Sequence, residues 1–552
     1  MSDLTHLPLI EEAVRACMNR GFYAHFPEHP KAYGEEAPAL GEAQFGQMLG
    51  RPFELQQEEE NGRSGEESSP YTRKALGILY PTFTPEKLVS RAKAAQPAWA
   101  STSFRNRADL LVESLDRMKD LFFLIAHATM HTTGQAFLMS FQASGPHAAD
   151  RALEAIAMGY HQLGMFPSRV SWEKPMGKSS IRLEKTFIPV PRGVSLAIGC
   201  STFPVWNTLP GLYASLVTGN PVIVKPHPTA VLPIALVVRE IRKTLLEHGH
   251  HPDICQLAVD TRDQPITKSL CEHPDVKLID FTGSSAFGAY VESLPGKTTF
   301  TEKAGVNAVI LDSVEDPAPV FQNLAFSLSL YSGQMCTAPQ NIFVPETGIP
   351  SSLGQIRYEE ILTMLLQAVK DLALHPKMGA GTLGAIQNQA TVDRAEKARE
   401  EGKALTEEIR IVNPDFPDAR TLSLVVLEVG ATDRKLFEKE WFGPVALVVK
   451  TRDTDESLDL SRKLAERHGA ITCAAYSRDL DTILAIGETM NEVFTPVSFN
   501  FTGPVWINQH AAFSDFHVTG GNPSGNASIT DPEFIDKRFV WVGNRYMGTP
   551  SA

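Results

Sequence analysis

The 552-residue sequence has little of what marks several common classes of protein. Its six cysteines show no Cys-x-x-Cys spacing, so the sequence predicts neither a disulfide framework nor a metal site. No apolar run approaches the length of a membrane span, and the first residues lack a basic segment followed by an apolar one. We therefore expect reduced thiols, a cytoplasmic location and no membrane partner.

An excess of basic residues is also absent. The formal net charge of -13 argues against a nucleic-acid partner, because a phosphate backbone is normally met by a basic face. Hydrophobic residues make up 43% of the chain and charged residues 21%, and a chain of this length buries large cores. These values predict a globular protein of two or three domains.

One cysteine stands in a segment suited to catalysis. Cys336 lies in GQMCTAPQ (333–340), between a predicted helix at 321–331 and a predicted buried strand at 341–345. A thiolate adds to a carbonyl carbon better than a hydroxyl group does, so Cys336 is the candidate nucleophile. We expect it to be partly exposed and framed by positive charge. The alternative is a structural role as a small buried apolar side chain.

A carboxylate candidate precedes this cysteine in the chain. Residues 299–312 predict two strands joined by a glycine turn, with Glu302 at the turn. A carboxylate at that place is able to activate a water molecule. The alternative is a surface ion pair with Lys303 or Lys185.

Two further segments predict a nucleotide site. Residues 194–228 read as a strand, a helix, a Gly-Asn turn and a strand ending at Lys225, and a surface role for this lysine is the alternative. Residues 278–291 read as a strand whose Gly283-Ser284 loop opens a helix. Helix amides and a serine hydroxyl suit a pyrophosphate, although the glycine spacing is not the dinucleotide fingerprint.

Together these segments resemble the aldehyde dehydrogenase superfamily, from about residue 85 to the C-terminus. The motifs of that family fall, in one order, on Phe203-Pro204, Gly219-Asn220, Lys225-Pro226, Phe281 to Ser284, Glu302, Cys336, and Glu440, Phe442, Gly443 and Pro444. Within the superfamily the chain looks most like the ring-opening aldehyde dehydrogenases of phenylacetate degradation, the PaaN type. The segments FPVWN, EKAGVN and GQMCTAPQ carry that closer resemblance.

The resemblance implies an α/β fold with a Rossmann-type cofactor domain, an α/β catalytic domain and a small β oligomerisation element. The implied segments are 1–75 as an N-terminal extension, 76–172 and 190–300 as the nucleotide-binding domain, 301–505 as the catalytic domain, and 173–189 and 506–552 as the oligomerisation element. It also implies a homodimer or a dimer of dimers. The polar run at 56–71 predicts a solvated loop or an ordered surface arm.

The resemblance further implies a reaction and its residues. Cys336 is the nucleophile and Glu302 the base for the hydrolytic water. Glu440 holds the nicotinamide ribose, and Phe442 packs beside it. The remaining residues implied in cofactor binding are Lys225, Phe203, Pro204, Gly283 and Ser284.

Two positions depart from the family pattern. Thr202 stands where the family has an oxyanion-binding asparagine, so Thr202 or Asn207 has to replace that donor. Pro228 stands where many NAD-preferring relatives have a ribose-binding glutamate, which leaves Lys225 in a cationic pocket. We therefore expect NADP or NAD as cofactor, with NADP slightly favoured.

The expected function is NAD(P)-dependent oxidation of an aldehyde to a carboxylate through a cysteine thioester. The resemblance implies a coenzyme A-linked semialdehyde of phenylacetate degradation as substrate. Two alternatives stay open. One is a catalytically impaired relative that binds a nucleotide or a partner, and the other is a cysteine thioesterase.

Overall fold

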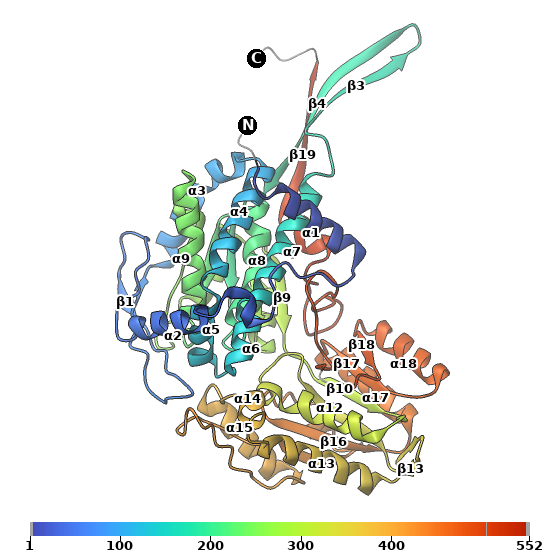
Figure 1. Ribbon diagram of the computed structural model, residues 1–552. Helices are drawn as coiled ribbons and strands as arrows, with labels where there is room; N and C mark the ends of the chain where they lie inside the picture. The colour runs from blue at the N-terminus through green and yellow to red at the C-terminus, as the bar shows by residue number, and fades with distance from the viewer. Residues whose placement is uncertain (1–3, 504, 548–552) are drawn as a thin grey trace.

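The computed structural model describes residues 4–503 and 505–547, which form two α/β lobes and a projecting three-stranded sheet (Figure 1). The α/β fold class expected from the sequence is confirmed. The outer ends of the predicted segments 1–75 and 506–552, residues 1–3 and 548–552, lie outside the described residues. No helix in the described part of the chain is long and apolar enough to cross a membrane.

The first lobe is built on a five-stranded parallel sheet. Its order is β7 (Cys255–Leu257), β6 (Val222–Lys225), β5 (Val194–Ile198), β8 (Val276–Gly283) and β9 (Thr298–Lys303). The strand order reverses on either side of β5, as in doubly wound nucleotide-binding sheets. The central strands are apolar and fully buried because helices cover both faces of the sheet.

Two helical layers cover this sheet. One face is packed by α8 (Pro204–Val217) and α9 (Leu232–Glu247), behind which lie α4 (Phe104–Lys119), α5 (Phe122–Thr133) and α7 (Pro146–Leu163). The other face is packed by α3 (Pro85–Ser101), α10 (Thr267–Glu272) and α11 (Ser285–Glu292). We call this unit the nucleotide lobe.

The second lobe, which we call the catalytic lobe, holds a seven-stranded sheet. Its order is β14 (Lys403–Ala404), β15 (Val425–Gly430), β16 (Val445–Thr451), β11 (Pro339–Pro345), β10 (Asn307–Leu311), β17 (Cys473–Tyr476) and β18 (Val497–Phe499). Only the short β14 runs antiparallel to its neighbour. One face packs on α12 (Pro317–Ser329) and α13 (Tyr358–Leu374), and the other packs on α15 (Gln389–Glu401), α17 (Thr454–His468) and α18 (Leu480–Glu492).

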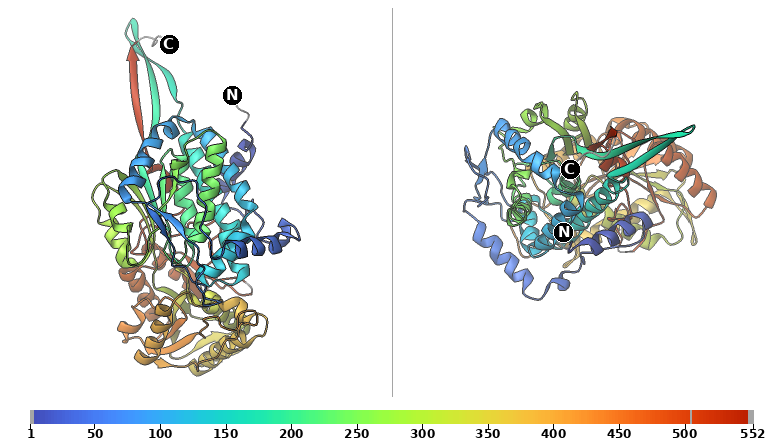
Figure 2. Two further views of the ribbon diagram at one scale, coloured as in Figure 1. Left: turned by 90° about the vertical axis from the view of Figure 1, so that its left-hand side faces the viewer. Right: turned by 90° about the horizontal axis from the view of Figure 1, so that it is seen from above.

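A long hairpin projects beyond the nucleotide lobe (Figures 1 and 2). Strands β3 (Arg169–Met176) and β4 (Ser179–Pro191) form it, and β19 (Phe539–Met547) completes an antiparallel sheet along β4. Most of its side chains are exposed or half-buried. The predicted oligomerisation segment 506–552 differs from this arrangement. Residues 507–538 contribute buried side chains to the two lobes, because Ile507, Phe513 and Phe534 pack there, and only β19 joins the sheet.

The N-terminal segment packs on the nucleotide lobe. Helices α1 (Leu7–Asn19) and α2 (Ala37–Met48) lie against α7 and α5. The polar run at 56–71 is an ordered arm and not a solvated loop. The buried Gln57 exchanges two hydrogen bonds with the backbone of Leu257, and the buried Glu67 accepts hydrogen bonds from the amides that begin α9. Polar residues are buried there because each has a specific partner.

Candidate active site

A strained turn places Cys336 between α12 and β11, as the sequence predicts. Tyr331, Ser332 and Gly333 all have positive φ values, of 50°, 50° and 65°. A Cβ at Gly333 would lie 2.3 Å from the backbone oxygen of Gly443, so only glycine fits at that position. The Tyr331 hydroxyl donates to the Thr133 carbonyl at 2.6 Å and helps to hold this conformation. Strained backbone of this kind clusters at functional sites.

The backbone around the cysteine is held by two asparagines. The side-chain amide of Asn307 donates to the carbonyl oxygens of Cys336 and Ala338, at 2.8 and 2.9 Å. The amide of Asn508 donates to the Thr337 carbonyl at 2.7 Å. The position of the sulfur is therefore set by residues from β10 and from the C-terminal segment.

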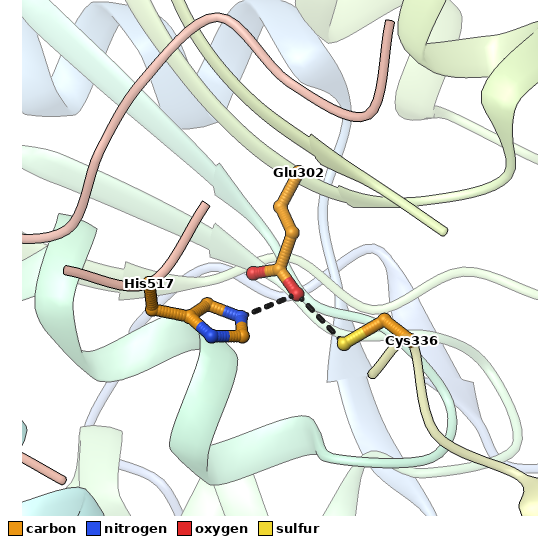
Figure 3. Close-up of side chains that lie close together, drawn as sticks. All are labelled: Glu302, Cys336 and His517. Atoms are coloured by element: carbon orange, nitrogen blue, oxygen red, sulfur yellow. Dashed lines mark hydrogen bonds and ion pairs between the residues drawn. The ribbon is translucent and has the colours of Figure 1, made fainter. Parts of the chain in front are cut away.

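The side chain of Glu302 reaches the sulfur from the end of β9 (Figure 3). The Cys336 thiol donates to Glu302 Oε1 at 3.0 Å, and the Asn207 amide donates to Oε2 at 2.7 Å. His517 Nε2 lies 2.9 Å from the same Oε1 atom. Glu302 is buried and has no ion pair with Lys303, which pairs with Glu292 at 2.6 Å. The surface ion-pair alternative for Glu302 is therefore wrong.

These contacts set the protonation of the pair. Burial raises the pKa of Glu302, but the charge that His517 carries when protonated and the hydrogen bonds with His517, Cys336 and Asn207 outweigh it and hold that pKa below its ordinary value. Burial and the negative charge of Glu302 raise the pKa of the Cys336 thiol well above its ordinary value. The half-buried Cys336 is therefore a thiol beside a carboxylate. The expectation of a positively framed thiolate is wrong, because the nearest charge is negative.

Thr202 and Asn207 lie at the start of α8, close to the reacting pair. The Thr202 carbonyl accepts a hydrogen bond from Gln135 at 2.7 Å, and its hydroxyl contacts Cys200. Asn207 is engaged by Glu302 and lies 3.5 Å from the Cys200 sulfur. The geometry thus ties Asn207 to the base, and either residue remains a predicted oxyanion donor.

A small cavity lies beside the base. It offers about 20 Å³ to the centres of water molecules and is lined in part by Asn207, Asp280 and Glu302. That space is sufficient for one water molecule, which needs roughly 10–15 Å³ by this measure. Glu302 is therefore placed to contact a water as well as the thiol.

The predicted nucleotide residues meet at the carboxyl ends of β6 and β8. Lys225 ends β6, but its ammonium is buried and forms an ion pair with Asp260 Oδ1 at 2.6 Å. Desolvation lowers the pKa of Lys225, and the Asp260 charge offsets part of that shift. The surface role for Lys225 is wrong, and so is the premise of an uncompensated cationic pocket, because Asp260 supplies a carboxylate that the sequence did not indicate.

The Gly283-Ser284 loop and the Phe203-Pro204 loop each lead from a strand of the nucleotide sheet into a helix. Gly283 ends β8, and Ser284 caps α11 by accepting a hydrogen bond from Phe287 at 3.4 Å. Phe203 precedes α8, Pro204 is its first residue, and the Phe203 ring stands edge-on to Tyr331 in the cysteine turn. The Phe203 loop therefore contacts the cysteine turn of the catalytic lobe.

Glu440 and Phe442 lie in the loop that precedes β16. Burial raises the pKa of Glu440 to about 7, and the charge of Arg394 lowers it in part. Arg394 also donates to the Phe442 carbonyl at 3.1 Å. The loop touches the cysteine turn through Gly443 and Gly333. The structure thus brings the two catalytic-lobe motifs together.

These residues fit a nicotinamide nucleotide. The carboxyl ends of β5, β6 and β8 converge where the strand order reverses, which is the usual ligand site of such sheets. The half-buried carboxylate of Glu440 lies on the catalytic side of that edge and makes no hydrogen bond to any described residue, which suits a ribose hydroxyl donor.

Sequence reasoning missed three residues of the site. His517, Asp260 and Asn307 all touch candidate residues, and His517 does so across 215 positions of the chain. No local pattern marks them. They are recognised only in the folded chain, where all three polar side chains are buried and therefore need hydrogen-bond or ion-pair partners.

A doubly wound nucleotide sheet, joined to a lobe that presents a thiol beside a carboxylate, defines a thiol-dependent dehydrogenase. The sequence profile of the aldehyde dehydrogenase family matches residues 59–537. The chain therefore belongs to the aldehyde dehydrogenase family and is an NAD(P)-dependent aldehyde dehydrogenase.

Similar solved structures and sequence relatives agree with this family assignment. A crystal structure described as an NAD-dependent aldehyde dehydrogenase from Burkholderia multivorans is 44% identical, with a TM-score of 0.97 and complete coverage of both chains. The 1-pyrroline-5-carboxylate dehydrogenase from Thermus with bound NAD shares the fold at 17% identity and a TM-score of 0.73, covering 96% of this chain and 99% of that one. A putative aldehyde dehydrogenase of Gibberella fujikuroi is 26% identical over 68% of this chain and 74% of its own length.

Proposed function

We propose that Cys336 is the nucleophile and Glu302 the base of a thioester-forming aldehyde oxidation. The observation that carries this proposal is the 3.0 Å contact between the Cys336 sulfur and Glu302 Oε1, with a water-sized cavity on the nucleotide-lobe side of Glu302. The low pKa of Glu302 and the raised pKa of the thiol make the carboxylate the acceptor of the thiol proton.

The protein's groups act in two stages. As the Cys336 sulfur bonds to the aldehyde carbon, its proton passes to Glu302, and Thr202 or Asn207 donates to the oxyanion. A nicotinamide nucleotide held at this site would supply the hydride acceptor, and loss of hydride would leave a thioester on Cys336. Glu302 then takes a proton from water as the water oxygen bonds to the acyl carbon. The carbon–sulfur bond breaks, and the second proton of the water passes to the leaving Cys336 sulfur, which restores the thiol and gives the carboxylate.

The cofactor would be held by both lobes. Lys225, Gly283 and Ser284 would face the adenosine and phosphate part, and Phe203 and Pro204 would line the passage to the sulfur. Glu440 and Phe442 would hold the nicotinamide end. We propose NADP as the slightly favoured cofactor. Asp260 neutralises the charge of Lys225, but Pro228 adds no second carboxylate that would repel a 2'-phosphate near Lys225.

We propose a coenzyme A-linked semialdehyde of phenylacetate degradation as the substrate. The resemblance of the segments FPVWN, EKAGVN and GQMCTAPQ to the ring-opening type supports this proposal. The test is a panel of short aliphatic, aromatic and coenzyme A-linked semialdehydes, each with NADP and with NAD. Turnover of the linked semialdehyde no better than that of a simple aldehyde would refute the substrate and leave the oxidation standing.

We also propose that the chain forms a homodimer or a dimer of dimers through the projecting sheet. Exposed apolar side chains on that sheet support this: Met176, Ile181, Ile188, Val190, Val540 and Val542. Light scattering of the purified protein tests it. A monomer at micromolar concentration would contradict it.

The central experiment replaces Cys336 by alanine and uses Cys200→Ala as the matched control, because both thiols are half-buried and Cys200 lies beside Asn207 while Cys336 lies beside Glu302. We expect Cys336→Ala to lose aldehyde oxidation and to bind cofactor within about threefold of the wild type, while Cys200→Ala stays active. Substantial turnover by Cys336→Ala would rule out Cys336 as the nucleophile. If the wild-type protein reduces neither cofactor with any aldehyde, a binding relative or a thioesterase becomes the better description.

A further inference from the structure

The proposed reaction needs an outlet for protons. An aldehyde, an oxidised nicotinamide and a water give a carboxylate, a reduced nicotinamide and two protons. One proton comes from the thiol and one from the attacking water, and the nearest acceptor for both is Glu302. Since Glu302 is buried, each proton has to leave through a neighbouring group before the next arrives.

Two histidines continue from Glu302 in a line of hydrogen bonds. His517 Nε2 lies 2.9 Å from Glu302 Oε1, and His517 Nδ1 lies 3.0 Å from His510 Nδ1. His517 is 3% exposed, whereas His510 is half-buried. The line therefore runs from the half-buried sulfur, through two buried groups, to His510, a residue that is partly exposed.

The loop that carries both histidines is fixed in place. The Arg151 guanidinium on α7 donates to the carbonyls of His510, Ala511 and Asp515 at 3.1–3.3 Å. The backbone of His517 exchanges two 2.9 Å hydrogen bonds with Ile529, and its ring stands edge-on to Trp206. Both imidazoles are thus held at proton-transfer distance and are not free to swing away.

We propose that His517 and His510 form the proton exit of this active site, an inference that rests on the proposed roles of Cys336 and Glu302. When His517 is neutral with its proton on Nδ1, protonated Glu302 gives its proton to His517 Nε2, and His517 then gives its Nδ1 proton to His510 Nδ1. His510 releases a proton to solvent, and tautomer exchange restores the Nδ1 proton of His517. One proton enters the pair and one leaves it in each passage.

The surroundings of His510 suit release. Burial of its ring, the charge of His517 and the charge of Arg151 hold the pKa of His510 well below its ordinary value. His510 therefore keeps a proton only briefly at neutral pH. The Asn207 amide, which donates to the other oxygen of Glu302, keeps that carboxylate turned with Oε1 toward the histidine. Asn207 thus positions the Glu302 carboxylate, and the two histidines remove its proton.

The test uses His517→Gln, His517→Ala and the control His248→Asn, a surface histidine that pairs with Glu113. Rapid mixing with an aldehyde and cofactor separates the first turnover from the later ones. An empty Glu302 accepts the first proton unaided, so we expect the first turnover to stay within about threefold of the wild type. Steady turnover of both His517 variants falls by about tenfold or more. Added imidazole restores steady turnover of His517→Ala, and the control matches the wild type.

A merely structural role for His517 would slow the first turnover as much as the later ones, would leave imidazole without effect, and would overturn the proposal. Steady turnover of His517→Gln within twofold of the wild type would overturn it as well. Hydrolysis of p-nitrophenyl acetate tests the exit without cofactor, because acylation of the Cys336 thiol and hydrolysis of the thioester each pass a proton to Glu302. If aldehydes are not oxidised but the ester is hydrolysed, the proposed oxidation fails. The rates of ester hydrolysis by the two His517 variants then still test the proton exit. If neither compound is turned over, both proposals fail.

Discussion

The guanidinium of Arg538 forms a bidentate ion pair with the carboxylate of Asp280, at 2.6 and 2.8 Å. Asp280 lies in β8 of the nucleotide lobe, and Arg538 precedes β19 of the projecting sheet. A Cβ at residue 211 of α8 would lie 2.4 Å from the Asp280 carboxylate, so Gly211 makes room for the pair. Arg538 is fully buried and also lies 4.0 Å above the ring of Phe300. The pair therefore joins the C-terminal segment to the nucleotide sheet.

Arg538→Met is expected to lower the free energy of unfolding of the nucleotide lobe by about 3–5 kcal/mol, because it leaves Asp280 largely buried without its partner. Urea denaturation followed by fluorescence measures the change. The adjacent Lys537→Met is the control, since Lys537 has only an exposed ion pair with Glu533 and its loss should cost less than about 1 kcal/mol. Equal effects of the two substitutions would contradict the assignment.

Glu302→Gln is expected to separate acylation from hydrolysis. Removing the negative charge removes one cause of the raised pKa of Cys336, so the thiol reacts without its base, whereas the water loses the carboxylate that takes its proton. We expect one rapid turnover of cofactor and then a steady rate about 100-fold or more below the wild type, measured by stopped flow. Glu292→Gln, which alters the neighbouring Lys303 pair, is the control. A uniform slowing of both phases would count against Glu302 as the hydrolytic base.

Cofactor affinity is expected to rise with pH through the pKa of Glu440, which burial raises to about 7. The ionised carboxylate accepts hydrogen bonds from ribose hydroxyls, and the protonated form, which dominates below pH 7, accepts fewer. The dissociation constant should therefore increase by up to about tenfold from pH 8 to pH 6, as one proton is taken up. Cofactor titration by fluorescence measures it. Glu440→Gln should abolish this dependence, and Glu438→Gln, whose carboxylate pairs with Arg434, should retain it. A pH-independent wild type would remove Glu440 from the site.

The sequence predicts the local parts of this site and not its long-range partners. The cysteine turn, the strand end at Lys225 and the Ser284 cap are each short segments whose residue types determine their backbone. Each was found where expected. The charge around Cys336 was predicted with the wrong sign, because the neighbour that determines it comes from a different lobe and side-chain direction is not visible in a motif.

The C-terminal segment shows the same limit. A glycine-rich, aromatic stretch suggests a connection, and nothing in it signals that His517 points at Glu302 or that Arg538 reaches Asp280. Buried polar groups need partners, so such residues become recognisable once the fold shows which side chains are removed from solvent. The fold class and the order of motifs were predictable from the sequence. The residues that pair with buried charges became known only from the three-dimensional structure.

The Lys225–Asp260 ion pair provides a test of cofactor choice. Replacing Asp260 by asparagine removes the counter-charge of a buried ammonium and keeps an amide oxygen for the Ile266 backbone amide, which now donates to Asp260 at 3.0 Å. An unpaired buried ammonium is costly. A 2'-phosphate placed near Lys225 restores a negative partner, whereas NAD brings none.

We therefore expect Asp260→Asn to raise the ratio of kcat/KM for NADP over that for NAD by about fivefold to tenfold, with most of the change in KM. Initial rates with one aldehyde and both cofactors measure the ratio. Asp263→Asn, at an exposed neighbouring position, should leave the ratio unchanged. If the Asp260→Asn ratio stays within twofold of the wild type, Lys225 does not face the 2' position. Discrimination between the cofactors then has to come from other residues of the loop after β6, such as His227, whose ring contacts Thr229 at 2.8 Å.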